Sequence, residues 1–431
     1  MAATPPPASP GGSATRALDI RTLNLDADDE LVDYIRCVRT SFLMPTAPEH
    51  FNHEALEHTR WRYQLGSTWA AFDGGTVRGT TRTFPTSLRL PGGGTVTASA
   101  LTQVTVLPTH TRRGLLTGLM RAQLEEAAQA GQPVSLLLAA EWPIYGRFGY
   151  GPATQAATWK VDLLRATVLD SPTGSIELVD ATELRKIVEQ VFAEHHARTP
   201  GAIDRDPAWW DVITGVSPRP GDEPKPARTR VVHRDADGRP DGYASYDPKE
   251  GEWEAFVADG TIRVDDLIAA TPEAERELWR YVCGIDLAAT LTVDHSVSLA
   301  LPYWLTNGRM ARMTARFDHV WVRLLDIPAA FAARRYPVAG SLVFDAVDPF
   351  LDRGGRFRLD VGDDGVATCS PTDDAPDVAG SVVAFGAAYL GGTRLADLEP
   401  AGLVEEHTSG SLERASTLLS WPVAPYCSTD F

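Results

Sequence analysis

Arg112, Arg113 and Gly114 stand where an alternating β-branched run changes into a helical pattern, in the stretch VTVLPTHTRRGLLTGLM at residues 104–120. A helix that begins here leaves the backbone N–H groups of its first turn without partners inside the helix. The same end carries the positive pole of the helix dipole, so it attracts a phosphate. Glycine also allows a ligand to approach the backbone closely. The junction therefore predicts a phosphate-binding site, and the alternative is a solvated arginine pair at an ordinary helix start.

The run that precedes the junction, residues 104–106, offers backbone donors and acceptors along a strand edge. An extended amide arm can bind such an edge as an added strand, while a pyrophosphate occupies the helix start. Coenzyme A has both parts. The donors expected at the pyrophosphate belong to six consecutive residues, namely Arg112, Arg113, Gly114, Leu115, Leu116 and Thr117.

Tyr145 is the second residue that could do chemistry. It lies in EWPIYGRFGYG at residues 141–151, directly after the apolar strand pattern PVSLLLAA at 133–140. If this strand runs parallel to residues 104–106, Tyr145 faces the place where the two strand ends meet. A phenol there can act as a proton donor, and the alternative is a packing role. The segment GRFGYG lacks the G-x-G-x-x-G spacing and a following helix, which argues against a dinucleotide loop.

The elements around these residues predict a mixed α/β region over residues 17–170. Residues 18–23 have a strand pattern, 26–43 and 114–131 have helical spacing, and 67–108 alternate like antiparallel strands with glycine-rich turns. The pattern QAATWKVDL at 155–163 predicts a strand that closes this region. Residues 1–16 are rich in Pro, Gly, Ser and Ala, so we expect a disordered tail.

Two further regions follow. Residues 171–310 predict a helix at 180–199, a hairpin at 227–248, a helix at 271–285 and a strand at 287–293. This order echoes the first region but lacks an Arg-Arg-Gly junction. Residues 311–431 again mix strands and helices, and the end is apolar and aromatic, which is typical of a docked terminus and not of a frayed one.

Composition limits the class of partner. The chain has 431 residues and a formal net charge of -17, which argues against nucleic acid and favours cationic partners such as amines. No apolar run approaches the about 18 residues that a membrane helix needs.

The four cysteines are scattered, without a C-x-x-C pair, and we expect a reduced, cytoplasmic protein. His195 and His196 are adjacent and point to different helix faces, so no metal site is expected.

The order of strand, phosphate-binding helix, strand and IYGRFGY resembles the GNAT acetyltransferases, in which a tyrosine at this place is the usual general acid. Together with YLGGTRLADL at 389–398 and the ending APYCSTDF at 424–431, the motifs resemble the enhanced intracellular survival (Eis) acetyltransferases over most of the chain. The resemblance implies an α/β (α+β) fold: a catalytic GNAT domain, a degenerate GNAT-like domain and a sterol-carrier-protein-like domain. It also implies a homohexamer that acetylates amines of aminoglycosides, with protein lysines as further substrates.

The resemblance assigns roles residue by residue. Acetyl-CoA contacts fall on residues 112–117 and on a second group at two strand ends, which comprises Val104, Thr105, Val106, Ala140 and Glu141. Tyr145 matches the general acid, and the carboxylate of the terminal Phe431 matches the general base. Two residues depart from the GNAT pattern. Thr111 stands where the pattern has Arg or Gln, and Leu116 stands where it has Gly or Ala. Side-chain charge is therefore expected to hold the phosphates less than backbone donors do.

Several questions stay open at this stage. The acceptor can be a small cationic amine or a protein lysine, and a non-catalytic acyl-CoA or lipid-binding protein is the alternative from a different class. Asp430 is a candidate for the amine site by proximity to the terminus, with a solvated charge as the other reading. Trp209 and Trp210 fit core packing better than a pocket wall. Because the middle region lacks the phosphate signature, we expect one active site per chain.

Overall fold

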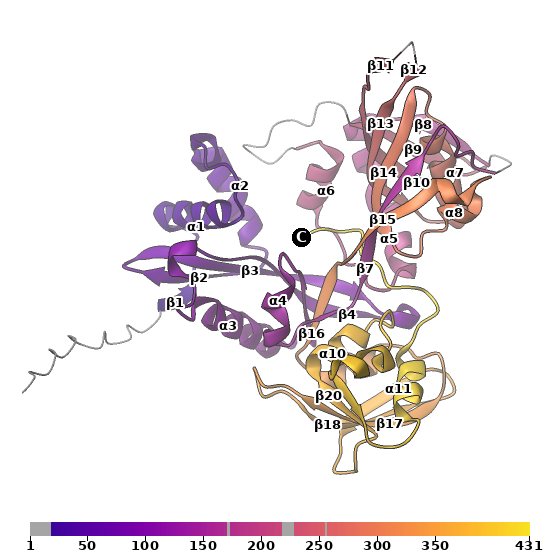
Figure 1. The fold of residues 1–431 in the computed structure, drawn as a ribbon. Helices are drawn as coiled ribbons and strands as arrows, with labels where there is room; N and C mark the ends of the chain where they lie inside the picture. Colours follow the sequence, from indigo (N-terminus) through magenta and orange to yellow (C-terminus); the bar gives the residue numbers. More distant parts are fainter. Residues whose placement is uncertain (1–18, 170–172, 218–227, 255–256) are drawn as a thin grey trace, which may run out of the picture.

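The protein, seen in a computed structural model, is described over residues 19–169, 173–217, 228–254 and 257–431. The expected tail at residues 1–16 lies outside this part of the chain. Two seven-stranded sheets and one five-stranded sheet each carry helices, and the chain terminus lies at the centre, between the first two sheets (Figure 1). Within these residues no helix has the length and apolar character to cross a membrane.

The first sheet has the order β1-β2-β3-β4-β5-β16-β6. Its first four strands are antiparallel neighbours, and β4 and β5 are parallel. The strands are β1 (Asp19–Thr22), β2 (Ser67–Asp73), β3 (Thr76–Arg89), β4 (Thr95–Val106), β5 (Val134–Leu138), β16 (Val320–Leu324) and β6 (Gly151–Pro152).

Helices cover both faces of this sheet. One face packs against α1 (Asp28–Ser41) and α2 (His53–Tyr63), where Leu31, Tyr34 and Tyr63 form a core with Phe72 and Val77. The other face packs against α3 (Leu115–Gln129) and α4 (Trp142–Tyr145). Alternating side chains of the strands supply both cores, because neighbouring residues of a strand point to opposite faces.

The parallel strands β4 and β5 separate part of the way along. Their ladder runs from Ala98 and Val134 to Leu101 and Leu137. Beyond it, β4 keeps its partner β3 on the other side, where Thr102 faces Arg82. Gln103 has a φ of 54° and lies in a bulge of this ladder. The edge of β4 after Leu101 therefore opens toward the end of β5.

The second sheet has the order β15-β7-β14-β13-β10-β9-β8. Its strands are β8 (Ser175–Leu178), β9 (Thr229–Arg234), β10 (Pro240–Lys249), β13 (Gly260–Ala269), β14 (Ala288–Ser296), β15 (Ala311–Asp318) and β7 (Gln155–Asp162). The expected hairpin is β9 and β10. The helices are α5 (Ala181–Arg198), α6 (Pro207–Thr214), α7 (Pro272–Cys283) and α8 (Leu301–Trp304). A separate two-stranded ribbon comprises β11 (Trp253–Glu254) and β12 (Val257–Ala258).

One strand assignment from the sequence is wrong. The strand β7, expected to close the first region, pairs with β14 and β15 in the second sheet. In its place β16, from the first residues of the region expected over 311–431, lies between β5 and β6. A strand pattern reports which residues extend but not which neighbour supplies the hydrogen bonds. The first two domains are therefore tied together by exchanged strands.

The third sheet has the order β19-β18-β17-β20-β21. Its elements are α9 (Ile327–Ala333), β17 (Gly340–Val347), β18 (Gly355–Val361), β19 (Ala367–Pro371), β20 (Val378–Ser381), α10 (Val382–Ala388), β21 (Val404–Glu406) and α11 (Ser411–Leu419). Short 3-10 turns occur at Pro48–Phe51, Pro91–Gly93, Pro108–His110, Gly146–Phe148, Gly308–Met310 and Leu395–Ala401. After α11 the chain returns to the first two sheets, and Tyr426, Cys427 and Thr429 are buried there. The expectation of a docked terminus is confirmed.

Candidate active site

The N-terminus of α3 has the conformation that a phosphate seat needs. Gly114 caps the helix at a φ of 81°, a left-handed value that favours glycine, and no side chain caps the first turn. Arg112 also has a positive φ, 62°, and is exposed. The Arg113 guanidinium donates to the Asp73 carboxylate at 3.0 Å, so part of its charge is already compensated. Backbone donors are therefore the main resource of this junction.

The remaining residues expected around acetyl-CoA belong to β4, to the first turn of α3 and to the segment after β5. Thr105 is buried, and its hydroxyl lies 2.6 Å from that of Thr80. Val104 and Val106 pack on the α3 side of the sheet. The side chains of Leu115 and Leu116, in the first turn of α3, pack into the core between this helix and the sheet. Thr117, Ala140 and Glu141 are exposed.

Tyr145 ends the short helix that follows β5. Its side chain is 5% exposed and packs with Leu101 of β4 and with Met120 and Leu124 of α3. Burial, with a smaller contribution from the charge of Glu141, raises the pKa of Tyr145 to about 12. Its hydroxyl has no hydrogen-bond partner within the described part of the chain. A neutral phenol with an uncommitted O–H is suited to donating a proton to a bound group.

A cavity of about 520 Å³ lies on the opposite face of the first sheet. Its walls come from α1, α2, β3, the bulge of β4, the segment before α6 and the last three residues of the chain. Phe431 and Asp430 line it, together with Trp209. Figure 1 shows the terminus between α2, α6 and β3. Tyr145 is not part of this wall, so the two expected catalytic groups lie on opposite sides of the β4 opening.

The last two residues are oriented by side chains of β3, of α6 and of the turn between β15 and β16. The Phe431 ring packs edge-on against Phe84 of β3, with centroids 5.9 Å apart. The Asp430 carboxylate pairs with His319 at 2.9 Å, and this hydrogen bond holds the pKa of Asp430 below its usual value. The indole N–H of Trp209 donates to the Asp430 carbonyl at 3.2 Å. Trp210 is buried, and Trp209 packs against the same core cluster while it also lines the cavity, so Trp209 combines the packing and the pocket role.

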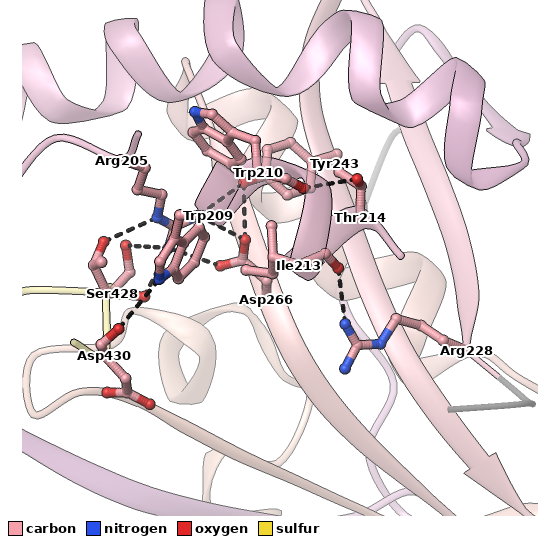
Figure 2. A network of polar contacts seen from close by, with 11 residues as sticks. Arg205, Trp209, Trp210, Ile213, Thr214, Arg228, Tyr243, Asp266, Ser428 and Asp430 are labelled. Carbon is pink, nitrogen blue, oxygen red and sulfur yellow. Dashed lines mark hydrogen bonds and ion pairs between the residues drawn. The ribbon is translucent and has the colours of Figure 1, made fainter. Parts of the chain in front are cut away.

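Arg205 anchors the segment that precedes the terminus. Figure 2 shows its guanidinium between Ser428 of the tail and Asp266 of β13. It donates to Asp266 at 2.9 Å, to the Ser428 carbonyl at 2.7 Å and to the Thr429 hydroxyl at 2.9 Å. Tyr243 adds a hydrogen bond of 2.8 Å to Asp266. The pair is fully buried, so its hydrogen bonds define the position of the tail closely.

Sequence reasoning missed this anchor and the cationic residues of the cavity wall. Arg205 and Asp266 are 61 positions apart, and no local pattern connects them. The only local signal is Asp206, whose side chain caps α6. The residues that hold the terminus are found only by tracing the tail through the fold.

The segment GRFGYG and the adjacent histidines His195 and His196 have packing roles. In GRFGYG, a side-chain carbon on Gly151 would lie 2.0 Å from the Val383 carbonyl, so this glycine permits close packing on α10. His195 contacts Thr199, and His196 faces the Ser87 carbonyl at 3.3 Å. Across residues 19–169, 173–217, 228–254 and 257–431 no group of three or more His, Cys, Asp or Glu side chains is arranged to hold a metal ion.

Comparisons with known proteins agree with this architecture. Residues 19–153 and 201–324 each match a family described as acetyltransferase (GNAT) domain, and residues 327–428 match the sterol carrier protein domain. An uncharacterized N-acetyltransferase of Streptomyces griseus is 37% identical over 95% of this chain and 99% of its own length. N-acetyltransferase Eis of Mycobacterium tuberculosis is 35% identical over 76% of this chain and 79% of its own.

The crystal structure of Eis1 from Mycobacterium abscessus superposes with a TM-score of 0.83 at 31% identity and covers 96% of this chain and 100% of that one. The fold and the matched domains thus define a tandem GNAT acetyltransferase with a sterol-carrier-like third domain. The chain belongs to the Eis family of N-acetyltransferases.

Proposed function

We propose that this enzyme transfers the acetyl group of acetyl-CoA to a primary amine bound in the cavity that the chain terminus enters. The observation that carries the proposal is the opening beside β4. On one side it has Tyr145 and the uncapped start of α3, and on the other side it has the cavity with Phe431. Such an opening lets the thioester of one substrate meet the amine of the other.

The residues at the opening fit acetyl-CoA. The start of α3, residues 112–117, has backbone donors for the pyrophosphate, and β4 beyond Leu101 has an edge that β5 does not pair. The pantetheine arm would add to that edge beside Val104, Thr105 and Val106. Ala140 and Glu141, at the end of β5, would close the site on the other side. No metal is required by this chemistry.

The proposed reaction is direct attack of a neutral amine on the thioester carbonyl. The C–N bond forms, the C–S bond breaks, and the amine gives one proton to the Phe431 carboxylate, directly or through water. Tyr145 donates its proton to the departing thiolate and recovers one from solvent or from the carboxylic acid. A free α-carboxylate has a pKa of about 3.5, and removal from water strengthens it as a base.

The acceptor is proposed to be a small molecule first and a protein lysine second. The cavity is within the range of about 300–1,000 Å³ that is typical of small-molecule sites. Asp204, Asp206 and Asp430 on its wall suit an ammonium group. Aminoglycosides, which the family resemblance suggests, present several amines to these carboxylates and belong in the first panel of acceptors.

Assembly is a separate proposal. The edge strand β15 of the second sheet exposes Met313 and Phe317, and Tyr303 nearby in the sequence is 88% exposed. These apolar side chains support association of several copies, and we keep the homohexamer as the expected state. Light scattering coupled to size-exclusion chromatography measures it directly, and a monomer at micromolar concentration would contradict it.

The test of the proposed function is thiol release from acetyl-CoA with aminoglycosides, polyamines and a lysine peptide as acceptors. The intact chain is compared with one that lacks Phe431 and with Phe431→Ala, which keeps a terminal carboxylate at the same position but loses the ring. Turnover by the intact chain and by Phe431→Ala, with a loss of about 10²–10⁴-fold on deletion, supports the carboxylate as base.

The other outcomes are equally informative. Equal turnover by the intact and the shortened chain would keep the enzyme and remove the terminal base. Coenzyme A binding without turnover of any acceptor would contradict the proposed reaction. A preference for the peptide over all small amines would move the assignment to protein lysines.

A further inference from the structure

The cavity that the terminus enters has two walls of opposite charge. The segment before α6 and the tail contribute Asp204, Asp206, Asp430 and the terminal carboxylate. The facing elements α1, α2 and β3 contribute Arg39, Arg62 and Arg82. A polycation satisfies only the first wall and meets like charge at the second. The pattern instead suits a ligand that carries both an amine and an acidic group.

Arg82 is the most deeply buried charge of the cationic wall. It is 6% exposed, yet it forms no ion pair with any acidic residue of the described chain. One Nη donates to the Arg62 carbonyl at 2.8 Å, and its buried Nε has no hydrogen-bond partner there. The rest of the guanidinium contacts the rings of Tyr63 and Phe84, at 5.0 and 5.3 Å from their centroids. Burial without a carboxylate partner lowers the pKa of Arg82.

Other buried arginines of the described chain are compensated. Arg205 pairs with Asp266, and Arg323 pairs with Asp348 at 2.5 Å. Arg334 has no carboxylate but donates to four carbonyls, two of them at 2.6 and 2.8 Å and two at 3.4 Å. A buried charge without such partners is costly to the fold. Arg82 has only one carbonyl acceptor. Its side chain lies on the wall of the cavity, where a bound ligand can supply an anionic partner.

The position of Arg82 relates it to the chain terminus. Arg82 and Phe84 are two residues apart on β3, so their side chains share a face about 7 Å apart along the strand. The Phe84 ring contacts the guanidinium on one side and the Phe431 ring on another. An acceptor bound between them places its acid group and its amine in one small volume.

We propose that Arg82 binds a carboxylate of the acceptor, so that the natural acceptor is an amine that also carries an acid, such as a free amino acid. This inference rests on the proposed function and narrows its substrate class. The carboxylate would accept charge-assisted hydrogen bonds from the guanidinium, and the amine would face the tail carboxylates.

The test uses pairs of acceptors that differ only in the carboxylate: L-lysine and cadaverine, L-ornithine and putrescine, L-phenylalanine and phenethylamine. Thiol release gives kcat and KM for each acceptor with the intact chain, Arg82→Met, Arg82→Lys and the control Arg36→Met, an exposed arginine of α1. We expect a KM lower by about 10- to 100-fold for the acid member of at least one pair. Arg82→Met removes that difference, and Arg82→Lys restores part of it.

The controls separate the possible failures. Arg36→Met leaves all values unchanged. Cadaverine, putrescine and phenethylamine keep their kinetics in Arg82→Met. No turnover of any acceptor, aminoglycosides included, would overturn the proposed function itself. Turnover without a preference for any acid member would overturn only the carboxylate site, as would an equal loss for both members of a pair in Arg82→Met.

Thermal unfolding supplies a second readout. Because Arg82 is buried without an ion-pair partner, Arg82→Met leaves the melting temperature unchanged or raises it if the residue is kept for a ligand. A marked fall in melting temperature, together with a uniform loss of activity, would assign Arg82 a packing role and contradict the proposal.

Discussion

The starts of α3 and α7 hold equivalent places in the two GNAT-like domains and have opposite properties. Each helix connects two parallel strands that pair with each other: α3 connects β4 and β5, and α7 connects β13 and β14. At α3 the cap is Gly114, without a side-chain acceptor and without acidic residues in the first turn. At α7 the Thr271 hydroxyl accepts from the Ala274 N–H, and Glu273 and Glu275 follow. The second helix start is occupied by its own chain and repels a phosphate.

The strand openings beside these helices differ in the same sense. The ladder of β13 and β14 ends at Val264 and Val293, as that of β4 and β5 ends at Leu101 and Leu137. Beyond it, His295 of β14 stacks on Tyr426 at 5.1 Å, and Asp266 of β13 binds the arginine that holds Ser428. The second opening therefore contains the protein's own tail. One topology thus leaves an open strand edge in the first domain, where we propose that acetyl-CoA binds, and holds the terminus in the second.

Replacement of Tyr145 by Phe tests the chemistry of the first opening and has the largest expected effect. Loss of the proton donor lowers kcat by about 10²–10⁴-fold, with little change in the KM for acetyl-CoA. Thiol release measures both. Tyr150→Phe is the matched control, because its buried hydroxyl contacts Ser135 at 2.7 Å on the same face. An equal loss in both variants would assign the effect to packing.

Replacement of Arg205 by Met tests the holding role of the second opening. It leaves Asp266 buried without its partner, so urea unfolding is expected to show a loss of about 3–5 kcal/mol. The double variant Arg205→Met with Asp266→Leu recovers stability because no buried charge remains. It does not recover turnover, since the tail has lost its anchor. Full turnover in the double variant would show that the terminus needs no such holder.

The pH dependence of stability tests the second opening, where His295 stacks on Tyr426 of the tail. Burial lowers the pKa of His295 to about 4, whereas an unfolded histidine titrates near 6.5. The unfolded state therefore binds the extra proton first. The contribution of neutral His295 to the free energy of unfolding is complete above pH 6.5 and is lost as the pH falls toward 4. At pH 5 the loss is about 2 kcal/mol. Urea unfolding at pH 7 and pH 5 measures the fall in the free energy of unfolding. We expect this fall to be smaller in His295→Gln than in the intact chain, and an equal fall in both would contradict the assignment.

The smallest effects come from the helix starts themselves. Gly114→Ala forces a side chain into a left-handed conformation at a cost of about 1–2 kcal/mol, and it raises the KM for acetyl-CoA about tenfold. Thr271→Ala removes a cap worth about 1 kcal/mol and leaves that KM unchanged. Steady-state kinetics and thermal unfolding measure the two quantities. A raised KM in Thr271→Ala would place part of the acetyl-CoA site in the second domain.

Much of the secondary structure and part of the site were predictable from the sequence. Hydrophobic periodicity indicates α3, α5 and α7 nearly to their ends, because a helix signal is contained in neighbouring residues. The Gly114 junction is equally local, and in the structure Gly114 stands directly before α3 in a left-handed conformation. The motifs also sufficed to predict the family, which the comparisons confirm.

Only the tertiary structure decided which sheet each strand joins and what surrounds the terminus. The exchange of β7 and β16, the Arg205–Asp266 anchor and the lack of an ion-pair partner for Arg82 in the described chain depend on residues far apart in the sequence. A strand can pair with any edge that fits its pattern, and a charged residue looks alike in sequence whether a counter-charge is near or not. The sequence by itself thus determined the elements and their local chemistry, whereas long-range packing determined the partners, because the free energy of a buried charge depends on its neighbours in space.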